Sequence, residues 1–109
     1  MARQEVCAKF HKAVELIGRR WSGALIQVLL QGRKRYAELR AAVPDITDRM
    51  LSERLRELED EGILARKVIP ETPVRVEYEL TTLGRDAGAP LAHLRTWVES
   101  NIHRFPAVA

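Results

Sequence analysis

Three hydrogen-bonding side chains recur along one stretch of the sequence, at a spacing that brings them to one side of a helix. Arg49, Ser52 and Arg56 are separated by three and four residues, and residues three or four apart are neighbours on an α-helix. An arginine guanidinium can pair through two hydrogen bonds with O6 and N7 of guanine, and a serine hydroxyl can contact several bases. These three residues are therefore our candidates for reading the edges of DNA bases.

The helix that would carry them has a start signal and a stop signal. Thr47 can cap its first turn, and Gly62 suits a left-handed position after its last turn. A helix over residues 48–61 would be roughly 21 Å long, a length that can lie along the major groove of DNA. Its apolar stripe, which would anchor it to a core, consists of Leu51, Leu55 and Leu58. The alternative is an ordinary solvated surface helix.

The elements around this helix complete a recognisable pattern. A short helix over residues 36–42 and a tight connection through Pro44 precede it, which is the helix-turn-helix arrangement. Residues 63–69 and 74–80 then favour two strands joined by a stiff, proline-containing loop. The sequence predicts a mainly α protein with a small β-hairpin wing (α+β), a winged helix-turn-helix, with the helix-turn-helix at about 36–61 and the wing at about 63–81.

Cations and hydroxyl groups beside these elements are candidates for holding DNA phosphates. The basic run 33–35 comes just before a helix N-terminus, where backbone N–H groups and the helix dipole favour an anion. A solvated basic turn is the alternative. We assign phosphate contacts to four residues, the last of them in the wing: Arg35, Tyr36, Thr47 and Arg75.

The two ends of the chain carry apolar stripes beyond those that a small core requires. Predicted helices lie at about 6–17 and, with a kink from Pro90 near residues 86–88, at about 82–103. A central core helix, capped by Ser22, is expected over residues 22–30. The stripes of the terminal helices predict a homodimer interface made by Phe10, Val14, Ile17, Leu91, Leu94 and Val98. Alternatively, the two terminal helices pack only on each other.

Composition and charge place these elements in one domain, 1–109. The 109 residues are 46% hydrophobic and 30% charged, with a net charge of +3 that is concentrated at the front: residues 1–35 hold eight Lys/Arg and two Asp/Glu. A basic patch is typical of polyanion binding. No apolar run is long enough to cross a membrane and the N-terminus lacks a secretory signal, so a cytoplasmic location is expected. No catalytic motif or cofactor motif is present, so we predict neither an enzyme nor a cofactor.

Several separate motifs resemble the HxlR-type winged-helix transcriptional regulators, a branch allied to the MarR regulators. The similarity spans about Cys7 to Trp97. The motifs that carry it are Cys7, Leu16-Ile17-Gly18 with Arg20-Trp21, Arg35-Tyr36 with Glu38-Leu39, Ile46-Thr47, Met50-Leu51-Ser52, Arg54-Leu55-Arg56, Leu58-Glu59, Gly62-Ile63, Pro70, Pro73, Arg75-Val76-Glu77-Tyr78, Leu80-Thr81 and Leu83-Gly84-Arg85.

The resemblance implies a bacterial homodimer that binds double-stranded operator DNA. The helix that follows Thr47 would enter the major groove, the hairpin would act as the wing and the terminal helices would form the dimer interface. Two acidic residues on the reading helix, Asp48 and Glu53, can accept from cytosine N4 but repel phosphates, so we expect them to act on selectivity. The rival function is a winged-helix protein-interaction module without DNA binding, and any small-molecule effector stays open.

The single cysteine offers a second kind of chemistry. Cys7 and His11 form an i, i+4 pair near a helix start, where the dipole favours a thiolate, and the resembled family includes sensors of oxidants and electrophiles. Ala8 stands where the family commonly has proline, a departure that bears on whether Cys7 keeps this sensing role. The alternative is a buried, inert cysteine. A zinc site with His93 or His103 lacks a second close-spaced ligand pair, so we predict no metal.

Overall fold

The computed structural model describes residues 3–106 and places them in helices, short strands and one turn of 3₁₀ helix. The helices are α1 (Arg3–Gly18), α2 (Ser22–Leu29), α3 (Tyr36–Ala42), α4 (Asp48–Asp60), α5 (Thr82–Asp86) and α6 (Gly88–Ser100). The strands are β1 (Lys34–Arg35), β2 (Leu64–Ile69) and β3 (Arg75–Leu80), and the 3₁₀ turn η1 (Ile102–Arg104) follows α6. The predicted fold class, mainly α with a small wing, is confirmed.

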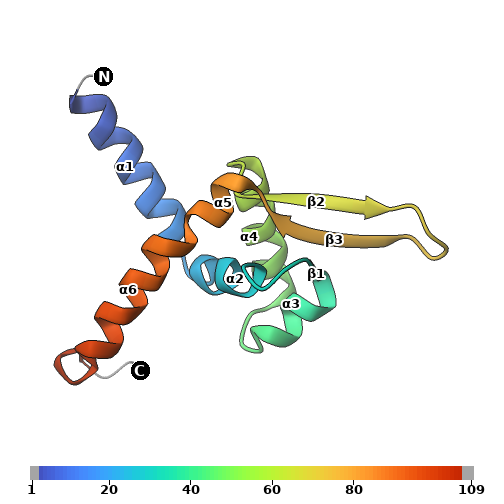
Figure 1. The fold of residues 1–109 in the computed structure, drawn as a ribbon. Coiled ribbons are helices and arrows are strands. Elements are labelled where there is room, and N and C mark those ends of the chain that lie inside the picture. The colour runs from blue at the N-terminus through green and yellow to red at the C-terminus, as the bar shows by residue number, and fades with distance from the viewer. Residues whose placement is uncertain (1–2, 107–109) are drawn as a thin grey trace.

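The molecule has a central helical body with projections on two opposite sides. Figure 1 shows α2, α3 and α4 gathered at the centre, the β2–β3 wing extending to one side, and α1 and α6 diverging on the other. Among the described residues, thirteen buried apolar side chains hold the centre. They are Leu25, Ile26, Leu29, Leu39, Val43, Ile46, Leu51, Leu55, Leu58, Ile63, Leu64, Leu80 and Leu91.

Both predicted ends of α4 are present. The Thr47 hydroxyl accepts a hydrogen bond from the backbone N–H of Met50 at 3.1 Å, and Gly62 adopts a left-handed conformation with φ of 76°. The helix ends at Asp60, one residue before the predicted end. Because the three leucines of its stripe are at most 3% exposed, one face of α4 is anchored and the other faces outward.

Lys34 and Arg35 of the basic run before α3 belong to a sheet, in a strand that the sequence analysis did not predict. Lys34 pairs with Tyr78 and Arg35 with Glu77, so β1 adds an antiparallel strand to the hairpin and the order is β1-β3-β2. A two-residue strand has no periodicity of its own. It exists only through pairing with β3, more than forty residues away, so local patterns do not reveal it.

The C-terminal stripe is divided between two helices. The Thr81 hydroxyl accepts from the backbone N–H of Gly84 at 3.1 Å and so caps α5, and the chain turns at Ala87 before α6. The break falls where a kink was predicted. Pro90 lies in the first turn of α6, where a helix N–H has no intrahelical partner, so the proline fits without losing a hydrogen bond.

The junction between α1 and α2 departs from the prediction. Helix α1 begins at Arg3 rather than near residue 6. Ser22 does not cap α2, because it already lies inside the helix and Trp21 occupies the cap position with φ of 78°. The Ser22 hydroxyl is buried without a hydrogen-bond partner among the described residues.

Candidate nucleic-acid interface

The outward face of α4 presents the three side chains that the sequence singled out. Arg49, Ser52 and Arg56 are all exposed, and the Arg49 side chain keeps 87% of its surface in solvent. Its Nε donates to Glu53 Oε1 at 3.1 Å. An exposed i, i+4 pair of this kind is weak, so a base edge can compete with Glu53 for the guanidinium.

Asp48, the first residue of α4, is held by donors from α3. Its Oδ1 accepts from the Tyr36 hydroxyl at 3.0 Å and from Arg40 Nε at 2.9 Å, and Arg40 also donates to the carbonyl of Ile46. The hydrogen bond from Tyr36, followed by the hydrogen bond and charge of Arg40, holds the pKa of Asp48 below its ordinary value. An ionised carboxylate therefore fastens the start of α4 to α3.

This arrangement bears on two of the predicted contacts. The Tyr36 hydroxyl has one proton, and in the free protein it is donated to Asp48, so a phosphate would have to compete for it. Arg40 was missed by the sequence reasoning. It lies eight residues before Asp48, and the contact exists only once the turn between α3 and α4 has folded, so no local pattern pointed to it.

The cations at the base of the wing are largely paired with wing carboxylates. Arg33 Nε lies 2.8 Å from Glu79 Oε2, and Arg33 Nη1 lies 3.7 Å from Glu77 Oε1. Partial burial acts to raise the pKa of Glu79, but the charge and hydrogen bonds of Arg33 and Lys67 outweigh it and hold that pKa below its ordinary value. Arg33 thus stabilises the wing although its side chain is 56% exposed, and the side chain of Arg35 is exposed as well.

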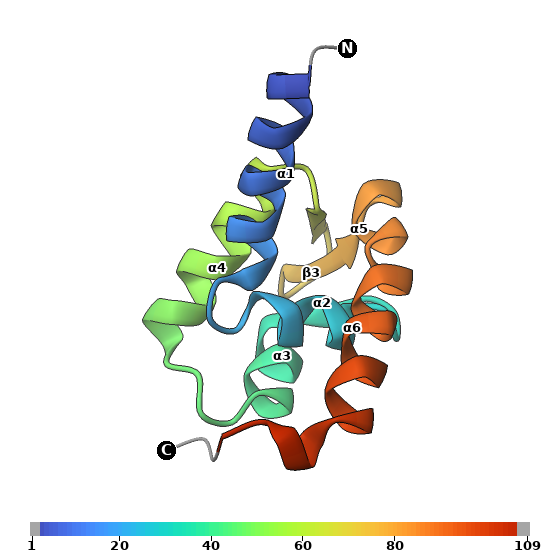
Figure 2. The ribbon, with the colours of Figure 1, turned by 90° about the vertical axis from the view of Figure 1, so that its left-hand side faces the viewer.

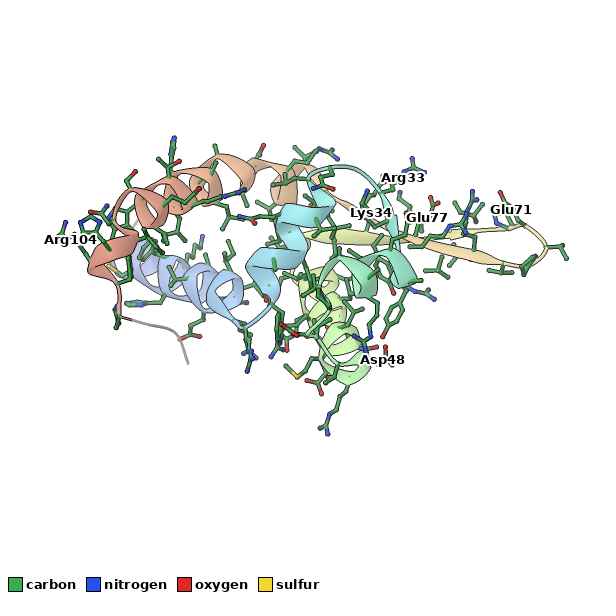
Figure 3. The ribbon with its side chains drawn as sticks, turned by 90° about the horizontal axis from the view of Figure 1, so that it is seen from below. Arg33, Lys34, Asp48, Glu71, Glu77 and Arg104 are labelled. Atoms are coloured by element: carbon green, nitrogen blue, oxygen red, sulfur yellow. The ribbon has the colours of Figure 1, made fainter. Side chains whose placement is uncertain are left out.

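Arg75 lies in the wing, as predicted, but its guanidinium has carboxylates on both sides. Nη2 donates to Glu71 Oε1 at 3.2 Å and Nε lies 3.3 Å from Glu77 Oε2. Figure 3 shows Glu77 beside Arg33 and Lys34, Glu71 toward the tip of the wing, and Asp48 separately at the α4 edge of the molecule. To contact a DNA phosphate, the Arg75 guanidinium would therefore have to give up one of these two carboxylate partners.

A second surface lies between the terminal helices, on the side away from the wing. Figure 2 looks at this side and shows α1 and α6 separated along their length. An apolar groove runs between them, and all six predicted interface residues line it: Phe10, Val14, Ile17, Leu91, Leu94 and Val98. Leu91 forms its floor at 8% exposed, whereas Phe10 and Leu94 are 64% and 52% exposed. The two terminal helices therefore do not cover each other's stripes.

Cys7 lies on α1 with an exposed side chain, so the burial expected in the alternative is wrong for the single chain. In the described part of the chain, no three His, Cys, Asp or Glu side chains come together as a metal site. No helix within residues 3–106 is long and apolar enough to cross a membrane.

Comparison with known proteins gives consistent results. A family described as HxlR-like helix-turn-helix matches residues 16–105. Among relatives from Bacillus subtilis strain 168, the uncharacterized HTH-type transcriptional regulator YvaP is 45% identical over 97 residues, covering 89% of this chain and 90% of YvaP. The HTH-type transcriptional regulator YodB is 43% identical over 94 residues, covering 86% and 84%.

Solved structures are similar as well. The reduced form of YodB has a TM-score of 0.82 at 38% identity, over 97% of this chain and 99% of that one. A diamide-treated YodB has a TM-score of 0.77 at 40% identity, over 92% and 94%. The redox regulator HypR in its oxidized form has a TM-score of 0.79 at 40% identity, over 85% and 96%.

Proposed function

Because this chain belongs to the HxlR-like helix-turn-helix family of transcriptional regulators, we propose that it is a homodimer that reads a pseudo-palindromic operator through α4. The family consists of regulators rather than enzymes. The observation that carries the proposal is the two-sided character of α4: its leucines are buried, and its opposite face presents Arg49, Ser52 and Arg56 to solvent.

The division of labour within the interface follows from chemistry. Arg49 and Arg56 can pair bidentately with guanine, and Ser52 can contact either donors or acceptors. Arg35, Tyr36, Thr47 and Arg75 would hold phosphates, which fixes orientation without reading sequence. In a dimer, two copies of α4 would enter successive major grooves about 34 Å apart, so the operator should have two related half-sites.

A gel-shift experiment against genomic fragments, including the region upstream of its own gene, tests this function. We expect a subset of fragments to be retarded by the full chain in the presence of excess random DNA. If no fragment is retarded even at low salt, where phosphate contacts are strongest, the protein-interaction module becomes the better description.

A redox or electrophile response through Cys7 is a second part of the proposal. Its support is the exposed thiol on α1 together with relatives described as a redox regulator in its oxidized form and as diamide-treated YodB. With one cysteine per chain, two thiols from different subunits can lose two protons and two electrons to diamide and form an intersubunit disulfide. An electrophile can instead alkylate each thiolate.

The response is tested by replacing Cys7 with serine. We expect diamide and a quinone to weaken operator binding by the unmodified protein, and Cys7→Ser to abolish that response while it leaves untreated binding within about twofold, because Cys7 lies away from the α4 surface. The same response in Cys7→Ser and in the parent chain would exclude Cys7 as the sensor.

A further inference from the structure

Arg54 differs from the other arginines of α4 because it points into the molecule. Its side chain is only 11% exposed. Its Nε donates to the backbone carbonyl of Arg20 at 3.0 Å, and its Nη1 donates to Glu57 Oε1 at 2.9 Å. A buried guanidinium that satisfies two acceptors in a fixed geometry is a strong constraint on both of them.

The acceptor of the first bond lies at the junction between α1 and α2. Arg20 is followed by Trp21, whose φ of 78° is left-handed, a conformation that costs free energy for a bulky residue and persists only when surrounding contacts hold it. The Arg20 guanidinium lies 4.8 Å from the Trp21 ring centroid, a further contact at this point. The hydrogen bond from Arg54 therefore connects α4 to the residue that precedes the left-handed Trp21.

Two ion pairs connect α1 and the residue after it to the C-terminal end of α4. Arg19 Nη1 lies 3.5 Å from Glu57 Oε1, the oxygen that Arg54 also uses, and Lys12 Nζ lies 3.4 Å from Glu61 Oε2. Figure 2 shows α1 running in front of α4 along this line. Lys12 of α1 and Arg19, just after it, thus face the acidic C-terminal end of α4 and not its N-terminal half, which carries Arg49 and Ser52.

We propose that Arg54 is a positioning residue for DNA recognition: it sets the placement of α4 from the α1–α2 junction, so that a displacement of α1 is transmitted to the reading helix. The expected effect of Arg54 on operator binding rests on the proposed function. The coupling between α1 and α4, however, is a property of the free protein and can be measured without DNA.

The first test is amide hydrogen exchange on the free full-length protein, comparing the parent chain with Arg54→Met. Methionine keeps much of the side-chain volume and removes both hydrogen bonds. We expect exchange to accelerate in α4 and in the first turn of α2, with β2 and β3 unchanged. A uniform acceleration, or no change in α4, would overturn the proposal, because either result describes a residue that contributes only general stability.

Arg85→Met is the matched control. Arg85 Nη1 also donates to a backbone carbonyl, that of Leu80, at 2.9 Å, but this bond joins α5 to β3. We expect Arg85→Met to lower the thermal stability about as much as Arg54→Met does, and to leave amide exchange in α4 unchanged. Equal acceleration of α4 by both variants would contradict a specific role for Arg54.

The second test compares operator and random DNA at a temperature where circular dichroism shows each variant to be folded. We expect Arg54→Met to weaken operator binding by about tenfold, as for the loss of a base contact, with random-DNA affinity within about twofold, because only base reading depends on the placement of α4. Arg54→Lys keeps the positive charge but not the planar geometry of the guanidinium, so its operator affinity should lie between those of the parent chain and Arg54→Met. Equal losses on both DNAs would overturn the proposal.

Glu57→Gln serves if Arg54→Met does not fold. The glutamine retains an acceptor for Arg54 but removes the negative charge shared with Arg19. Amide exchange in α4 should therefore accelerate, but less than expected for Arg54→Met. No acceleration at all would contradict the proposal. If the parent chain binds no operator, the proposed function fails while the exchange experiment still decides the role of Arg54.

Discussion

Arg56 and Arg75 are both proposed DNA contacts, and their surroundings favour different roles for them: Arg56 is exposed, whereas the side chain of Arg75 is 32% exposed. Arg56 lies on the outward face of α4 and has no ion-pair partner among residues 7–106, whose side chains the structure describes. Arg75 lies between two glutamates in the wing. A guanidinium without a competing carboxylate is free to pair with guanine, whereas one that is already neutralised gains less from each new contact.

Replacing each arginine with alanine separates these roles. Arg56→Ala should cost roughly 1–3 kcal/mol at the operator and relax the preference at one base position in each half-site. Arg75→Ala should weaken operator and random DNA alike and flatten the dependence of affinity on salt by about one unit of slope. Titrations of both DNAs at two salt concentrations measure this. Equal losses on both DNAs for Arg56→Ala would exclude base reading.

Asp48 gives the helix-turn-helix a pH dependence with a defined sign. Its folded pKa is held below the model-compound value of 3.8 by Tyr36 and Arg40. A lowered carboxyl pKa stabilises the folded state above the unfolded pKa, and this contribution disappears as the pH falls through the folded pKa. The bonds from α3 therefore stabilise the start of α4 at neutral pH and lose that effect only in acid.

The test compares the free energy of unfolding of the parent chain and of Asp48→Asn across pH, at one protein concentration. We expect the parent chain to be the more stable at neutral pH, and the difference to shrink as the pH falls below 3.8. A difference that stays constant, or that grows toward acid, would show that the carboxylate charge has no part in holding α4.

At the scale of elements, the sequence was most informative where a structural cause is local. The cap by Thr47, the left-handed Gly62 and the leucine stripe of α4 depend on residues within a few positions of one another, and all three are present. Strand β1 and the bonds of Arg54 and Arg40 depend on partners that only the folded chain brings near. The parts of the site that hold α4 in place were therefore not predictable from sequence spacing.

The contact between α5 and the start of the wing is closer than a side chain allows. A Cβ added to Gly84 would lie 2.1 Å from the carbonyl oxygen of Ile63 and 3.0 Å from Leu80 Cδ2. The same Ile63 carbonyl accepts from the Thr81 backbone N–H at 3.0 Å. This backbone cannot retreat without losing that bond, so the glycine fixes how α5 joins β2 and β3.

Gly84→Ala should therefore destabilise the protein by about 1–3 kcal/mol, as overpacking does, measured as a lower midpoint in urea. Gly88→Ala is the control. Its added Cβ would meet only the Leu30 side chain, at 3.1 Å, and Leu30 is 42% exposed and can turn aside. We expect a change of less than about 1 kcal/mol there. Similar losses at both glycines would mean that the close approach to Ile63 is unimportant.

At the scale of the whole molecule, the uneven charge along the chain has a structural use that the sequence alone did not reveal. The excess of cations in residues 1–35 was interpreted as a surface for polyanions. Lys12 and Arg19 instead pair with Glu61 and Glu57 at the C-terminal end of α4, and Arg33 pairs with the wing. Three of the eight cations in this segment thus complement carboxylates of the same chain.

The groove between α1 and α6 is an apolar surface that the described part of the chain leaves uncovered. Phe10, Val14 and Leu94 are each more than half exposed along it. Exposed apolar area of this kind favours an interface with another protein. Because the proposed operator has two halves, a second copy of the same chain fits as the partner. Dimerisation would then determine both the spacing of the two α4 helices and the affinity gained by linking them.

Leu94→Asp tests this at the centre of the groove. Burying an unpaired carboxylate in an apolar interface is costly, so light scattering should report a monomer at micromolar concentration. Operator affinity should fall by about a hundredfold or more, because the second half-site no longer benefits from the first. Val74→Asp is the matched control. Val74 is 64% exposed, immediately precedes β3 of the wing and is not among the residues that line the groove, so its variant should remain a dimer. If Leu94→Asp remains a dimer as well, the groove is not where two copies meet.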